Sequence, residues 1–131
     1  MAAGVQARVL IVARDDSTAG PLAEGLDRLG WRTVTARGPK SAVAALSDLQ
    51  IQAVIVDVAA FGADAPNFAA ELKAACAPRK LPVIAMGEPD PFLNDRGYDL
   101  TLSAPLHPAQ AAMRLETLVR LGITPIRPQG G

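Results

Sequence analysis

The sequence predicts an α/β domain in which helices cover both faces of a parallel five-stranded sheet. Short apolar runs alternate with helix-period segments five times along the 131 residues, and the first, third and fourth runs are almost continuously apolar. Strands that alternate with helices form parallel sheets, and continuous apolar strands are typical of sheets buried on both faces. A chain of this length can bury one core, so we expect a single domain.

Five short runs rich in β-branched residues, bounded by Gly, Pro or Asp, predict the strands. They are residues 8–13 (RVLIVA), 31–36 (WRTVTA), 53–57 (AVIVD), 81–86 (LPVIAM) and 98–102 (YDLTL).

The segments between these strands predict the helices. The first covers residues 21–29 and ends at Gly30, and the second covers residues 41–49. The third starts after an N-cap at Asp64 and runs to about Ala77, and the last opens at His107. The residues expected to face the core from the first, second and last helices are Leu22, Leu26, Leu29, Val43, Leu46, Leu49, Ala112, Leu115 and Val119. Residues 87–97 leave room for only one or two helical turns, so the fourth helix should be short.

The turn after the first strand selects between the two common doubly wound folds. A dinucleotide-binding fold needs G-x-G-x-x-G at this turn, but the chain has ARDDSTAG, and it has no phosphate-binding G-x-x-x-x-G-K either. We therefore expect a flavodoxin-like three-layer sandwich, (βα)5, with strand order 2-1-3-4-5. In that fold the functional site lies beyond the carboxyl ends of the first and third strands.

Composition excludes several classes of function. Thirteen basic and thirteen acidic residues cancel, and only 4% of residues are aromatic, so nucleic acid is not an expected partner. No apolar run reaches the roughly 18 residues of a membrane span. Cys76 is the only cysteine, which predicts a reducing, cytoplasmic setting.

In the order and spacing of its motifs, the chain resembles the receiver domain of two-component response regulators. The matching pieces are VLIVARDD, GWRTVTA, AVIVD, LPVIAMG and SAPLHP. The resemblance covers residues 8–121, after an N-terminal extension of residues 1–7. Residues 122–131, which include PIRPQGG, are expected to form a linker to a further, C-terminal output domain.

The resemblance implies five working positions. In the family, an aspartate after the third strand accepts a phosphoryl group, two acids hold Mg²⁺, and a hydroxyl and a lysine contact the phosphate. The phosphoacceptor position falls on Asp57. The acid positions fall on Ala13 and Arg14, the hydroxyl position on Gly87, and the lysine position on Ala104 before the retained Pro105. Four of the five positions have therefore lost their chemistry, and we expect Asp57 to be silent and Mg²⁺ binding to be weak or absent.

Two neighbouring features have alternative interpretations. Asp15 and Asp16, with Ser17 and Thr18, either cap the following helix or supply part of a metal site. The guanidinium of Arg14 either pairs with Asp57, taking the place of the cation, or is solvated at the strand end.

Three other residues have simpler expected roles. His107 should cap the last helix, Cys76 should be a small packing residue, and Trp31 should be half-buried, although it could also anchor a partner.

The resulting prediction is a degenerate receiver, or pseudo-receiver, that is not an enzyme and acts through a protein partner or as a homodimer. The expected surface is formed by the fourth helix, the fifth strand and the last helix, with Tyr98, Arg114 and Arg120 as candidate contacts. The alternatives are an unorthodox receiver still phosphorylated on Asp57 and a small-ligand sensor with an apolar pocket over Gly87 and Ala104.

Overall fold

The computed structural model describes residues 8–47, 51–61, 65–77, 81–87, 98–102 and 107–120. Its helices and strands are β1 (Arg8–Val12), α1 (Asp16–Arg28), β2 (Arg32–Ala36), α2 (Pro39–Ala45), β3 (Ile51–Asp57), α3 (Val58–Phe61), α4 (Ala65–Cys76), β4 (Val83–Met86), β5 (Leu100–Leu102) and α6 (Pro108–Arg120). The predictions made for Asp64, Leu49, Ala104, Pro105 and the short fourth helix lie outside the described residues, as do those for the side chains of Asp16, Thr18, Val119 and Arg120.

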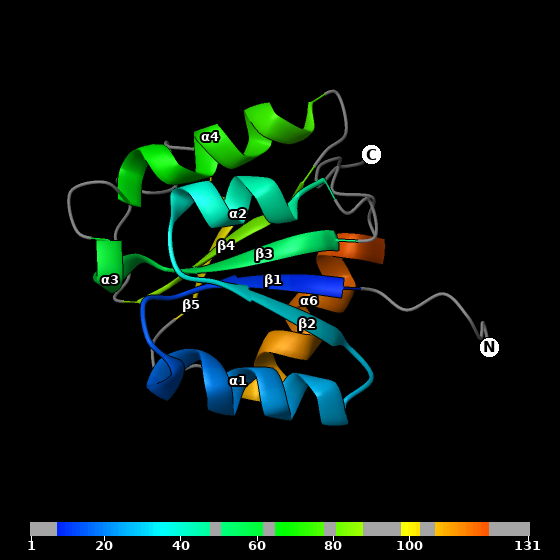
Figure 1. The fold of residues 1–131 in the computed structure, drawn as a ribbon. Helices are drawn as coiled ribbons and strands as arrows, with labels where there is room; N and C mark the ends of the chain where they lie inside the picture. The colour runs from blue at the N-terminus through cyan, green and yellow to red at the C-terminus, as the bar shows by residue number, and fades with distance from the viewer. Residues whose placement is uncertain are drawn as a thin grey trace.

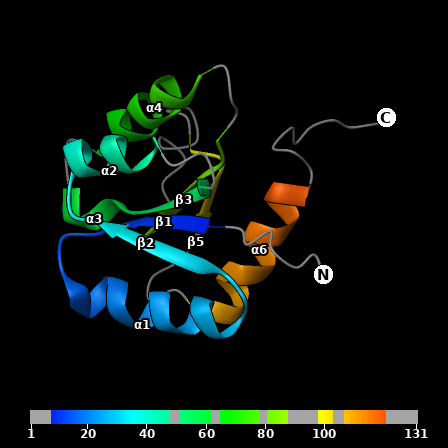
Figure 2. The ribbon, with the colours of Figure 1, turned by 45° about the vertical axis from the view of Figure 1, so that its right-hand side comes forward.

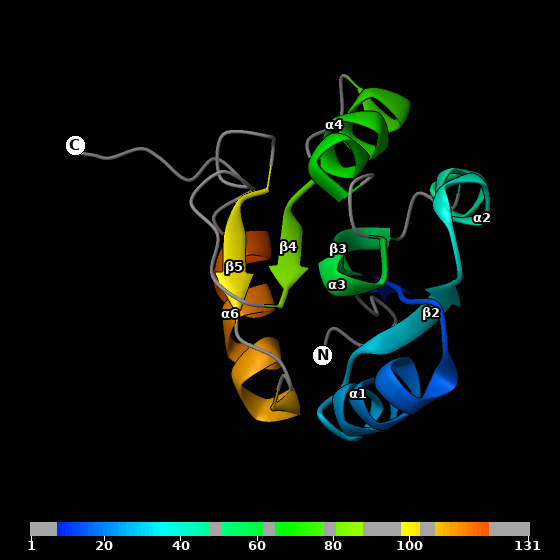
Figure 3. The same cartoon turned by 90° about the vertical axis from the view of Figure 1, so that its left-hand side faces the viewer.

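The described strands form one parallel sheet in the order β2-β1-β3-β4-β5, which confirms the predicted fold class. Helices α1 and α6 cover one face, and α2 and α4 cover the other (Figure 1). Figure 2 shows the same separation from a second direction, and Figure 3 shows the strands side by side between the two helical layers. None of the helices in the described part of the chain is long and apolar enough to cross a membrane.

Each face of the sheet buries its own apolar cluster, because successive side chains of a strand point to opposite faces. In β1, Leu10 and Val12 join the cluster under α2 and α4, whereas Val9 and Ile11 join the one under α1 and α6. These four side chains are fully buried. The same alternation in β3 and β4 explains why the sequence of these central strands is almost continuously apolar.

The helices differ from the prediction at their ends. Helix α1 begins at Asp16, before Pro21, so the proline lies inside the helix and not at its start. Leu29 follows the end of α1 and is 51% exposed, and Val43 in α2 is 40% exposed, so neither faces the core as predicted. Helix α2 begins at Pro39, a position where proline is favoured, and not at residue 41 as predicted. The residue of this helix that faces the core is Ala42.

Gly30 ends α1 as predicted, through a Schellman motif. Its φ of +100° lies in the left-handed region that favours glycine. The N–H of Gly30 donates to the carbonyl of Asp27 at 3.1 Å, and the N–H of Trp31 donates to the carbonyl of Leu26 at 3.0 Å. Trp31 is half-buried against the cluster under α1 and α6, which confirms its expected packing role.

Helices α1 and α6 approach each other closely at Gly25. A Cβ atom at this position would lie 2.4 Å from Cβ and Cγ of Pro108, the first residue of α6. Just before it, His107 accepts a hydrogen bond on Nδ1 from the N–H of Ala109 at 3.3 Å, which confirms the predicted N-cap. The absent side chain of Gly25 therefore sets the spacing between two helices of one layer.

The amino ends of β4 and β5 are joined by Asp99. Its carboxylate accepts hydrogen bonds from the backbone N–H of Val83 at 2.8 Å and from Nζ of Lys73 in α4 at 2.9 Å. The backbone N–H of Asp99 in turn donates to the carbonyl of Val83 at 2.8 Å. One side chain thus ties two strands and a helix together at the end of the sheet opposite to the predicted site.

Candidate functional site

Parallel pairing brings the predicted phosphoacceptor and acid positions to one edge of the sheet. In the register of β1 and β3, Val12 lies beside Val56, so that Ala13 and Asp57 follow at the carboxyl ends of adjacent strands. Ala13 is buried, and its N–H donates to the carbonyl of Ala36 at 3.0 Å. This edge is where a flavodoxin-like fold places its functional site.

Asp57 is the last residue of β3, and α3 begins at the next residue. Its half-buried carboxylate accepts hydrogen bonds from the N–H groups of Ala59 and Ala60. These are the second and third residues of the helix, so Asp57 is the N-cap of α3. Burial raises the pKa of the Asp57 carboxyl and the charge of Asp15 raises it further, while the two N–H groups lower it; the net shift is upward from the ordinary value of 3.8.

Arg14 is turned toward α3 and not toward the Asp57 carboxylate. Its Nε donates to the carbonyl of Ala60 at 2.8 Å, and its guanidinium carbon lies 5.4 Å from the centre of the Phe61 ring. Within the described residues, no ion pair joins Arg14 to Asp57. The suggested pairing with Asp57 is therefore not formed. The Arg14 side chain is exposed, as the alternative of a solvated arginine predicted, but it also contacts Ala60 and Phe61.

Phe61 is fixed in turn by the core. It is 6% exposed, and its ring packs edge-to-face against Phe68 of α4, with 5.1 Å between centroids. The guanidinium of Arg14 thus lies over a ring that is held in place by the cluster under α2 and α4.

Asp15 precedes α1 and organises its first turn. Its carboxylate accepts a hydrogen bond from the hydroxyl of Ser17, and its carbonyl accepts one from the N–H of Ala19 at 3.3 Å. These contacts fit the predicted role at the helix terminus, where a negative charge is also favoured.

The two acid positions at this edge, Ala13 and Arg14, supply no ligand for a magnesium ion. No group of three or more His, Cys, Asp or Glu side chains that could hold a metal occurs in the described part of the chain. The carboxylate of Asp57 is bound to two N–H groups, and the acid position beside it is filled by a cation. Mg²⁺ requires oxygen ligands in near-octahedral geometry, which Ala13 and Arg14 do not supply.

Gly87 stands at the hydroxyl position, and the side chain of Val58 occupies the space beside it. The residue is buried, and its N–H donates to the carbonyl of Leu102 at 2.9 Å. A Cβ atom at position 87 would lie 2.8 Å from Cγ2 of Val58, closer than any ordinary contact. The position therefore has no room for a Ser or Thr side chain in the present arrangement.

The candidate interface residues have separate outcomes. Tyr98 is 3% exposed and packs in the cluster under α2 and α4, so its proposal as a surface contact is wrong. This burial raises the pKa of the Tyr98 hydroxyl to about 12. Arg114 of α6 is exposed as expected, and its neighbour Met113 is 64% exposed. Cys76, with 9% exposure, has the predicted packing role.

Val58, Ala60 and Phe61 contribute to the site but were not recognised in the sequence. All three belong to α3, a helix of four residues that directly follows a strand. The stretch VAAF has no helical period that can be read at such a length, since it is shorter than two turns. The usable signal was Asp57 itself, because Asp is a preferred N-cap.

Comparison with known proteins agrees with this fold. No family model and no curated protein matches the sequence. Among solved structures, a CheY-like response regulator receiver domain from Methylobacillus flagellatus is 20% identical, with a TM-score of 0.74 over 86% of this chain and 98% of that one. The signal receiver domain of a modulated diguanylate cyclase from Desulfovibrio desulfuricans G20 is 24% identical, with a TM-score of 0.75 over 89% and 96%.

A third similar structure is longer than this chain. It is a probable two-component system response regulator/GGDEF domain protein that is 19% identical, with a TM-score of 0.78 over 89% of this chain. The present chain spans 50% of its length. These likenesses establish that the chain has the fold of receiver domains.

Proposed function

We propose that this chain is a pseudo-receiver domain of a two-component signalling protein, which works by protein contact and not by Mg²⁺-dependent phosphorylation. One observation carries the proposal: Arg14 stands at the second acid position and its side chain is committed to Ala60 and Phe61. A receiver uses a divalent cation to neutralise the incoming phosphoryl charge, and a fixed guanidinium at a ligand position opposes that cation.

Two further contacts support a silent Asp57. The Asp57 carboxylate already accepts hydrogen bonds from the N–H groups of Ala59 and Ala60. At the hydroxyl position, Val58 fills the space that a Ser or Thr side chain would need at residue 87. The contacts around Asp57 and around residue 87 therefore both support a site that does not accept a phosphoryl group.

The proposed partner is a protein or a second copy of the chain, bound in a cytoplasmic setting. The exposed Met113 and Arg114 of α6 lie on the last helix, which belongs to the expected contact surface. A similar structure that joins a receiver-like fold to a GGDEF domain supports an output domain as the C-terminal neighbour. Replacing both residues by Glu should abolish dimerisation in sedimentation velocity if this surface joins two copies.

The decisive experiment incubates the purified chain with acetyl phosphate and Mg²⁺ and measures the intact mass. We expect no added phosphoryl group under conditions in which an ordinary receiver is fully modified. A phosphoryl adduct on the wild-type chain that disappears in Asp57→Asn would establish the unorthodox phosphoacceptor instead. In the Asp57→Asn control, any adduct that remains identifies modification elsewhere.

A further inference from the structure

The outer edge of β2 is open in the described part of the structure. The strand order places β2 at the end of the sheet, where β1 is its only partner among the described strands. The carbonyl of Ala36 accepts from Ala13 on the β1 side, and backbone groups alternate in direction along a strand. The N–H and C=O groups of Thr33 and Thr35 therefore point away from β1, toward the open side.

This edge lies in a segment of the chain that carries basic residues and no acidic ones. From residue 28 to residue 47 the sequence contains four basic residues, Arg28, Arg32, Arg37 and Lys40, and no acidic one. The whole chain carries no net charge, so the positive charge of this segment is balanced by acids elsewhere. Arg32 is exposed at the start of β2, whereas Arg28 forms a long, exposed ion pair of 3.8 Å with Glu24.

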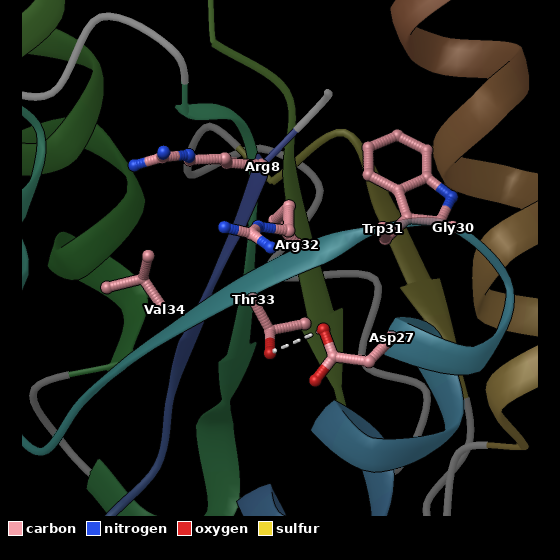
Figure 4. A pocket seen from close by; sticks show the side chains of 7 residues that line it. All are labelled: Arg8, Asp27, Gly30, Trp31, Arg32, Thr33 and Val34. Carbon is pink, nitrogen blue, oxygen red and sulfur yellow. Dashed lines mark hydrogen bonds between the residues drawn. The ribbon is translucent and has the colours of Figure 1, made fainter. Parts of the chain in front are cut away.

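A cavity of about 490 Å³ follows the same edge and is lined by Arg8, Asp27 and the consecutive residues 30–34 (Figure 4). The lining includes the exposed Arg32 and the half-buried Trp31. Asp27 is the single acid of the lining, and its carboxylate accepts a hydrogen bond from the Thr33 hydroxyl at 3.4 Å. The cavity lies at the amino ends of β1 and β2, at the opposite end of the sheet from Asp57.

We propose that the β2 edge is a docking site for an extended acidic segment of a partner protein. The segment adds to the sheet as a further strand, with its backbone paired to Thr33 and Thr35 and its carboxylates placed near Arg32. Strand addition of this kind takes affinity from main-chain hydrogen bonds and specificity from the flanking side chains. The proposal concerns a different surface from the α6 contact and is independent of whether Asp57 is phosphorylated.

Charge also selects this occupant over two others. A second copy that paired through the same edge would bring two basic segments together, and like charges across paired strands are destabilising. Residues 1–7 and 121–131 of the chain itself contain no Asp or Glu, so neither terminal segment supplies the carboxylates. A partner segment that alternates acidic and β-branched residues fits both the backbone and the charge.

The test uses a capped seven-residue peptide of alternating Glu and Val, titrated into the ¹⁵N-labelled chain. We expect chemical shift changes centred on residues 31–36 and slower hydrogen exchange at the outward N–H groups of Thr33 and Thr35. The same peptide with Lys in place of Glu should not bind. No change in β2 at millimolar peptide, or equal binding of the Lys peptide, would overturn the proposal.

Two variants examine charge and backbone separately. Arg32→Glu should weaken binding by about tenfold or more, whereas Asn67→Glu, which adds a negative charge at an exposed position of α4, should leave it unchanged. Thr35→Pro removes an outward N–H donor without removing a bond to β1, and proline is tolerated on such edges. Loss of binding with a retained spectrum is the expected result; if Thr35→Pro unfolds the chain, the hydrogen-exchange measurement on the wild type decides the backbone part.

Discussion

Replacing Gly87 by Ala tests whether Val58 has closed the hydroxyl position. The added Cβ would lie 2.8 Å from Cγ2 of Val58, and ordinary contacts begin at 3.4 Å, so one of the two must move by about 0.6 Å. Gly87 is not among the described glycines with positive φ, so alanine meets no backbone strain there. Overpacking a core costs about 1–3 kcal/mol, and the lower entropy of the unfolded alanine chain returns about 0.4–1 kcal/mol. We expect a net loss of about 1–2 kcal/mol.

A double-mutant cycle with Val58→Ala isolates the contact. Val58 is partly buried, so its truncation alone should cost roughly 1 kcal/mol. In the Val58→Ala background the clash is absent, and Gly87→Ala should become neutral or slightly stabilising. The double variant should therefore be more stable than the sum of the single changes predicts, by about 1–3 kcal/mol.

Urea denaturation provides the measurement, with the fluorescence of Trp31, the only tryptophan of the chain, as the probe. Free energies of unfolding are comparable between variants as long as the slope with urea is unchanged. Additive effects in the cycle, or stabilisation by Gly87→Ala alone, would show that position 87 has room for a side chain. That result would remove one of the supports for a silent site.

Three other predictions concern stability. Gly25→Ala should destabilise the chain by about 1–3 kcal/mol because the new Cβ would meet Pro108 of α6; an unchanged or higher Tm in thermal unfolding would contradict the close packing. Asp99→Ala should cost about 1–3 kcal/mol in urea titrations because it leaves a backbone N–H of β4 without its acceptor, and truncating its lysine partner should cost less than about 1 kcal/mol. The raised pKa of Asp57 means that the folded state binds the carboxyl proton more tightly than the unfolded state does. The stability that this proton contributes is present below pH 3.8 and is lost as pH rises through the folded pKa. The Tm of Asp57→Asn relative to wild type should therefore increase between about pH 3 and about pH 7, and a pH-independent difference would refute this.

The strands were predictable because their signal is local. Each predicted strand agrees with the described one to within two residues at either end, since buried parallel strands are continuous apolar runs. The start of α1 was misplaced because the periodic leucines begin only at Leu22, while the observed start depends on the hydrogen bonds around Asp15. The exposure of Leu29 has a similar cause, because the Schellman motif at Gly30 ends the helix before that residue turns inward.

The site could be located from the sequence, but its contacts could not. Asp57 and Gly87 were placed correctly at the carboxyl ends of β3 and β4, because the order of strands along the chain fixes those positions. The contact of Arg14 with Ala60 joins residues 46 positions apart and exists only because a short helix follows β3 without a loop. Tyr98 was misassigned to the surface for a related reason, since its burial depends on packing from distant elements.

The junction of β3 and α3 also affects how such domains are classified. A side chain that caps the first turn of α3 has a structural role whether or not a phosphoryl group ever reaches it. A classification that scores this aspartate alone does not distinguish a capping side chain from a phosphoacceptor. The residues at the neighbouring positions, here Arg14 and Gly87, are the ones on which the proposed silent site depends.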